Sequence, residues 1–196
     1  MPSRLHACIV LVLAFAFIVL APCACKRASD AEAKPLHEKD GRGHPEPMVQ
    51  TLACDRLPRD GRIMKTTTIP RGCVLHLDQT IVVDADATLV IEPGVHLLFA
   101  KTTGLVVLAG DLEAKGEKGA EIVFDSDATV PAEKDWAGIE LTASSSSGGQ
   151  SLLDNVMIEH AGSGGRASLL VHSGAHVTIG SCSVKHDGGA GIQLVP

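Results

Sequence analysis

Short apolar segments separated by polar turns fill the stretch between residues 87 and 124. Five of them follow one another there, with the sequences TLVI, VHLLF, GLVVL, DLEA and EIVF. None of them extends into the 3.6-residue period of an amphipathic helix, and each has the length of a β-strand. The pattern therefore predicts a succession of short strands.

The connections between these segments are EPG, KTTG, AG and KGEKG. They lack the Asn-Gly or Asp-Gly pairs that reverse one strand into a hairpin with the next. We therefore expect the strands to turn corners and to continue in one rotational sense, as they do in a solenoid.

A repeat in the second half of the chain supports this interpretation. Residues 152–162 (LLDNVMIEHAG) align with residues 178–188 (TIGSCSVKHDG) at an offset of 26, and the apolar positions coincide. A second segment recurs as GIEL, SLLV and GIQL, at residues 138–141, 168–171 and 191–194. Repeats of this period indicate stacked structural units, here called rungs.

Stacked rungs place equivalent side chains above one another in inward-facing ladders. We expect His160 and His186 to stack at one corner, with Lys185 and Asp187 on either side of His186. The two imidazoles could bind a metal or act in acid–base chemistry, but a structural hydrogen bond at the corner is the preferred interpretation. The predicted ladders are Leu105, Ile139, Leu169 and Ile192, then Val107, Leu141, Val171 and Leu194, and finally Phe124, Ile158 and Val184.

The succession TLVIEPG, GLVVLAGDLEAKG, IVF, DWAGIEL, LLDNVMIEHAG and VTIGSCSVKHDGGAGIQL resembles the right-handed parallel β-helix repeat family of exported bacterial proteins. The resemblance covers residues 80–196. It implies an all-β fold, a right-handed parallel β-helix of four to five rungs with an N-terminal cap. It is not specific for activity, because related β-helices include polysaccharide lyases, glycoside hydrolases and adhesins. It also implies a protein of the cell surface, often concerned with carbohydrate.

Residues 1–25 have the pattern of an export signal. Arg4 precedes an apolar run over residues 7–21, which is shorter than the roughly 20 residues needed to span a bilayer. The following LAPCAC resembles a bacterial lipoprotein signal, with Cys23 or Cys25 as the lipidated residue. The alternatives are simple secretion after cleavage nearby, or an uncleaved anchor. We expect an exported protein, either membrane-anchored through a lipid or secreted.

Three further regions follow the signal. Residues 26–50 are charged, rich in Pro and Gly and nearly free of large apolar side chains, which predicts a disordered tether. Residues 51–79 form the expected cap, in which Cys54 and Cys73 would be joined by a disulfide worth about 3 kcal/mol. The β-helix would occupy residues 80–196. Its last strand would be unpaired, so either the chain is truncated there or another chain stacks on this end.

Charge excludes one class of partner. Residues 74–196 contain six Lys and Arg against sixteen Asp and Glu, a net charge of −10. Nucleic acid phosphates require clustered basic side chains, so we expect no nucleic acid partner. This surface is also a poor match for polyanionic glycans.

Candidate ligand-binding residues lie in the turns that are longer than a minimal rung requires. The acidic loop over residues 126–136 contains Asp127, Asp135 and Trp136, and Asp125 directly precedes it. These carboxylates suit calcium, the one cofactor that the sequence suggests. Arg166 is the only Arg after residue 73 and belongs to a Gly-rich turn.

Three functions are compatible with these features. A scaffold or interaction domain at the cell surface, with another surface protein as partner, is the first. A carbohydrate-binding module that stacks sugars on Trp136 is the alternative. A polysaccharide lyase or glycoside hydrolase is the third, but the sequence offers no convincing set of catalytic residues.

Overall fold

The computed structural model describes residues 50–54 and 57–196, and nearly all regular structure in these residues is β-strand. A single 3₁₀ segment, η1 (Ser163–Gly165), lies between two strands of this region. No helix among the described residues has the length and apolar character needed to cross a membrane. The strands are β1 (Gln50–Thr51), β2 (Arg62–Ile63), β3 (Thr67–Ile69), β4 (Val74–Leu77), β5 (Ile81–Val83), β6 (Thr88–Ile91), β7 (His96–Phe99), β8 (Leu105–Val107), β9 (Asp111–Lys115), β10 (Ile122–Ser126), β11 (Ile139–Ala143), β12 (Ser151–Asp154), β13 (Val156–Glu159), β14 (Leu169–Gly174), β15 (Val177–Ile179), β16 (Ser183–Lys185) and β17 (Ile192–Val195).

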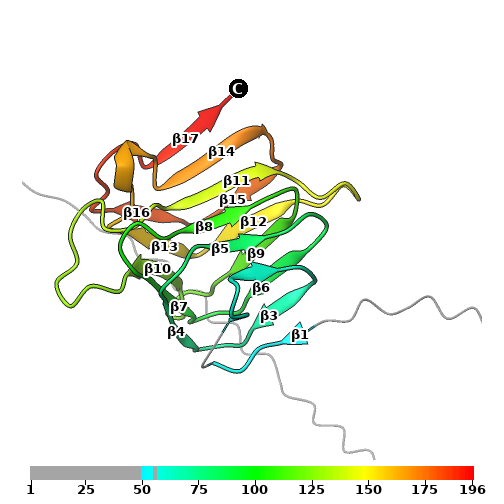
Figure 1. The fold of residues 1–196 in the computed structure, drawn as a ribbon, viewed down its shortest axis with the longest axis horizontal. Helices are drawn as coiled ribbons and strands as arrows, with labels where there is room; N and C mark the ends of the chain where they lie inside the picture. Colours follow the sequence, from blue (N-terminus) through cyan, green and yellow to red (C-terminus); the bar gives the residue numbers. More distant parts are fainter. Residues whose placement is uncertain (1–49, 55–56) are drawn as a thin grey trace, which may run out of the picture. The chain divides into compact units, whose positions relative to one another are not determined.

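The strands form three parallel sheets, and from β2 onward each sheet takes every third strand of the chain (Figure 1). The first sheet has the order β1-β3-β6-β9-β12-β15, the second β16-β13-β10-β7-β4 and the third β17-β14-β11-β8-β5-β2. Each complete rung therefore contributes one strand to each sheet. This is a right-handed parallel β-helix, as predicted, with five complete rungs in the described chain after a first one that supplies β1 and β2.

Alternation of side chains along each short strand creates the core. In β6 the two residues Leu89 and Ile91 are buried, whereas their neighbours Thr88 and Val90 are only half-buried. Inward residues of successive rungs lie directly above one another because the strands pair in register. The five strands predicted between residues 87 and 124 correspond to β6 through β10.

The predicted inward ladders are confirmed by this register. Ile139 pairs with Leu105 on one side and with Leu169 on the other, and Leu169 pairs with Ile192. The other two ladders, which run through Leu141 and Ile158, have the predicted members as well.

Two kinds of backbone conformation allow the tight corners between sheets. Gly138, before β11, has φ 95°, and a Cβ there would lie 2.6 Å from the carbonyl oxygen of Ser168 in the next rung. Glycine is thus required at this corner. His160 and His186 follow β13 and β16 with φ 57° and 51°, the left-handed conformation that turns the chain sharply.

The coil begins earlier than the expected residue 80, because β3 and β4 already pair with strands of the next rung. Cys54 and Cys73 form the predicted disulfide, with a Cα–Cα distance of 5.0 Å. Leu52 and Leu57 are buried in the same core cluster as the strands. This segment therefore closes the N-terminal end of the core.

Cys182 is a free and half-buried cysteine in the last rung. Its Sγ donates to the carbonyl oxygen of Leu153 at 3.4 Å, and burial raises the pKa of its thiol. Both features suit a role as a small apolar packing residue.

The predicted signal peptide (residues 1–25), including Cys23 and Cys25, and nearly all of the predicted tether (residues 26–50) lie outside the described residues.

Candidate functional site

A row of polar side chains crosses the outer face of the second sheet near the ends of its strands. The strand register places His76 beside Leu98 and Leu98 beside Asp125. Phe124 pairs with Ile158, so the residues that follow them, Asp125 and Glu159, are also neighbours. Glu159 in turn pairs with Lys185. Neighbouring positions in parallel strands are about 4.8 Å apart. Two carboxylates from adjacent rungs are thus held side by side.

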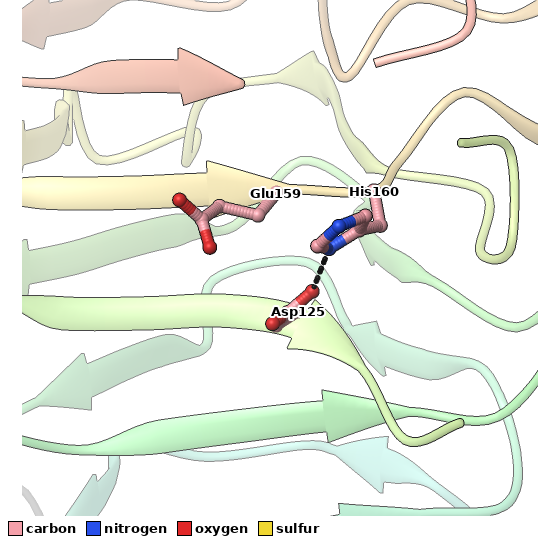
Figure 2. Close-up of side chains that lie close together, drawn as sticks. All are labelled: Asp125, Glu159 and His160. Atoms are coloured by element: carbon pink, nitrogen blue, oxygen red, sulfur yellow. Dashed lines mark hydrogen bonds and ion pairs between the residues drawn. The ribbon is translucent and has the colours of Figure 1, made fainter. Parts of the chain in front are cut away.

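The densest part of this row combines Asp125, Glu159 and His160 (Figure 2). Nδ1 of His160 lies 2.7 Å from Oδ1 of Asp125, and one donor atom from each of the three residues lies within 4.8 Å of the others. The side chains are 18–19 % exposed, so each is held by its neighbours while one part remains accessible to solvent. Such a cluster can bind a cation or exchange a proton.

The corner residues hold this cluster from the following rung. The imidazoles of His160 and His186 stack with centroids 5.1 Å apart and planes 9° apart, as the repeat predicted. Nζ of Lys185 lies 3.6 Å from Oε1 of Glu159 and balances one of the two carboxylates. The ring of His160 is therefore fixed from both sides, by a carboxylate below and an imidazole above.

The other two acidic residues of the predicted site have contacts of their own. Asp127 pairs with Nδ1 of His76 at 2.6 Å. Asp135 is buried and accepts hydrogen bonds from the backbone amide of Ala132 at 2.9 Å and from Oγ of Ser126 at 2.8 Å. The Ala132 amide bond is the main reason why the pKa of Asp135 is lowered. Of the three carboxylates considered for calcium, only Asp125 belongs to the cluster of potential ligands.

Trp136 is a core residue, so the expectation that it offers a stacking surface to sugars is wrong. Its side chain is fully buried and stacks on Phe99, with centroids 4.5 Å apart. Its Nε1 donates to the carbonyl oxygen of Glu159 at 2.7 Å. The indole therefore supports the strand that carries the cluster, but it presents no face to a ligand.

Arg166 is exposed and lies in the turn before β14, whereas Asp125 lies in a strand of another sheet. It forms an ion pair with Glu140, whose other carboxylate oxygen lies 2.9 Å from Nε2 of His172. Glu140 and His172 belong to β11 and β14 of the third sheet, whereas Asp125 is the penultimate residue of β10 in the second. The structure thus does not assemble Arg166 with Asp125 and Asp127 into one site. The adjacent cavity, lined in part by Glu140 and Arg166, is small, about 90 Å³.

Glu159, Glu140 and His172 escaped the sequence analysis. Glu159 is the outward residue that precedes the corner His160, and the repeat aligned it with Lys185. Alignment of the outward positions of the strands EIVFDS and VMIEHAG would have placed it beside Asp125. The pairing of Glu140 with Arg166 joins a strand to a turn and has no comparable signal.

A second distinctive region is the terminal rung, formed by β15, β16 and β17. These strands pair on one side only among the described strands. Three of its apolar side chains are exposed: Ile179 (37 %), Ile192 (46 %) and Leu194 (75 %). The end of the core is therefore uncovered here, in contrast to the closed opposite end.

No family model matches the chain, and no curated protein or solved structure matches it either.

Proposed function

We propose that the protein is an exported β-helix scaffold that associates with a second copy of itself through its terminal rung. The observation that carries this proposal is the exposure of Ile179, Ile192 and Leu194 at that end. These residues continue the inward ladders of the core. Covering them with matching apolar side chains would contribute about 25 cal/mol for each Å² removed from water.

The strand edges of the terminal rung support association. β15 (VTI) and β17 (IQLV) carry no charged side chain, and β16 (SVK) carries only Lys185. Natural sheets protect unpaired edges with charges, bulges or covering segments. The terminal rung has little of this protection, so its free amide and carbonyl groups are available to another strand.

A second copy of the chain is the partner that this surface fits. Two terminal rungs related by a two-fold axis would bring identical apolar positions and identical strand edges together, with the strands antiparallel across the interface. At the opposite end of the described coil, Leu52 and Leu57 are buried in the core cluster. Because such a two-fold contact uses the same surface on both copies, it closes at a dimer.

Export is supported by two features of different kinds. The leader over residues 1–25 has the composition of a signal peptide, and Cys54 and Cys73 are joined by a disulfide. Structural disulfides are typical of oxidising compartments. Mass spectrometry of the mature N-terminus tests this part of the proposal: an acylated Cys23 or Cys25 indicates a lipid-anchored form, cleavage nearby indicates a secreted one, and an intact Met1 overturns both.

Sedimentation velocity over a hundredfold concentration range tests the association. We expect the wild type to shift from monomer to dimer, and Leu194→Lys to remain a monomer because it places a charge in the interface. Val130→Lys is the matched control, since Val130 is also exposed (82 %) but lies in the outer loop before β11. A wild type that stays monomeric, or a dimer that Leu194→Lys leaves intact, would overturn the proposal.

A further inference from the structure

We propose that Asp125, Glu159 and His160 form a binding site for a divalent transition-metal ion of the zinc class. The three residues supply one imidazole nitrogen and two carboxylate oxygens, and the donor atoms lie within 4.8 Å of one another. Zinc binds such donors at about 2.0–2.2 Å, which places ligand atoms of one metal about 3.3 Å apart. Small side-chain rotations are enough to close the cluster around an ion.

The donor set decides the class of metal. Calcium and magnesium prefer oxygen ligands only, whereas imidazole suits zinc, copper, nickel and iron. The calcium interpretation of the acidic loop offered Asp125, Asp127 or Asp135 as ligands. The structure engages Asp127 with His76, and Asp135 with Ser126 and Ala132. With His160 in their place, the cluster favours a transition metal.

The fold orients these ligands before any metal arrives. Asp125 is the penultimate residue of β10, and Glu159 ends β13 in the next rung. Each directly follows a residue of the Phe124–Ile158 pair, so the strand register fixes their separation. The left-handed conformation of His160 brings its ring back over Asp125 (Figure 2). The stacked ring of His186 holds it there. A metal would take the place of the proton shared by His160 and Asp125.

The local negative charge also attracts a cation, and the ammonium group of Lys185 competes with a metal ion for Glu159. Two carboxylates face one ammonium group, and Nζ of Lys185 lies 3.6 Å from Oε1 of Glu159. The Lys185 side chain is 53 % exposed, so it can move into solvent when a metal binds Glu159. Removal of this lysine should therefore strengthen metal binding. A purely structural ion-pair network would give no such increase in affinity for a metal.

The partial exposure of the ligands leaves room for another ligand. Each side chain is 18–19 % exposed, and the cluster lies on the outer face of the sheet. A four-coordinate ion held by three protein ligands keeps one position for water or for an anionic group of a ligand. The proposed site is thus open.

Equilibrium dialysis of the purified full chain against Zn²⁺ tests the proposal. We expect His160→Gln and Asp125→Asn each to lose one equivalent of bound zinc or to weaken it by more than about tenfold, since even indirect contacts to a metal contribute 10–100-fold. Lys185→Gln should bind zinc more tightly than the wild type. Circular dichroism must show an intact β-structure in each variant.

His172→Gln is the matched control, because it disrupts another His–Glu pair on a different sheet. It should retain the wild-type zinc stoichiometry. Equal stoichiometry and affinity in the wild type and in His160→Gln would overturn the proposal. Displacement of the zinc by an equal concentration of calcium would overturn the assignment of the metal class.

Discussion

Phe99 and Trp136 stack face to face inside the β-helix, with ring planes 6° apart, although they are 37 positions apart in the sequence. Both side chains are fully buried. Trp136→Ala would leave a large cavity, and we expect it to lower the free energy of unfolding by about 3–5 kcal/mol. Trp136→Phe should be milder because it keeps a ring against Phe99. Urea unfolding measured by circular dichroism checks both values.

Fluorescence of the wild type provides an independent control on this position, because Trp136 is the only Trp of the chain. We expect a blue-shifted emission that iodide does not quench until the protein unfolds. Efficient quenching in the folded protein would contradict the burial of Trp136 and restore it as a surface residue.

One inward ladder contains two isoleucines that differ in burial, so the same substitution can be compared at a covered and at an uncovered position. Ile139 is 1 % exposed, whereas Ile192, two rungs later in the same ladder, is 46 % exposed. We expect Ile139→Ala to destabilise by about 2–5 kcal/mol and Ile192→Ala by less than half of that amount in the monomer. Denaturant midpoints at low protein concentration measure the difference. Equal losses would mean that the terminal rung is covered.

The disulfide between Cys54 and Cys73 closes a loop with a sequence separation of 19. In the chain-entropy model, removing such a crosslink costs about 3 kcal/mol. We expect the Cys54→Ser and Cys73→Ala double variant to unfold at a correspondingly lower urea concentration. Reduction of the wild type should reproduce that shift, and reduction of the double variant should cause none.

Acid should weaken the fold partly through Asp135. Hydrogen bonds from the Ala132 amide and from Ser126 lower the pKa of Asp135 below its usual 3.8. A lowered pKa contributes stability that is complete above the pKa of the unfolded state and is lost as the pH falls through the lower folded value. Unfolding free energies at pH 7 and pH 3 should therefore differ less in Asp135→Asn than in the wild type. An unchanged difference would contradict this role.

The fold was largely predictable from sequence because each rung of a parallel β-helix shows the same pattern of inward apolar residues and turns. The alternation in β6 to β10 and the offset of 26 between the His160 and His186 segments specify strands, register and inward ladders together. The residue at which the β-helix begins was harder to predict from the sequence. β3 and β4 are short and lie between turn residues, so they had no repeat partner strong enough to separate them from a cap.

The candidate site was predictable only where it coincided with the repeat. The stacking of His160 and His186 followed from their alignment, and Asp125 was singled out as a candidate calcium ligand beside the acidic loop. Trp136 was misplaced because the two-residue period does not extend into loops, so it does not tell which way a side chain points there. Glu159 was missed because the search for ligands covered the acidic loop and did not compare the outward positions of neighbouring strands.

The unequal ends of the coil give the protein a direction of unravelling. In a solenoid each rung is held only by its immediate neighbours. β17 is held along one edge, whereas the opposite end is fastened by the Cys54–Cys73 crosslink. Thermal fraying or a pulling force should therefore release β17 first and proceed rung by rung toward the crosslink, so that the first complete rung is the last to yield.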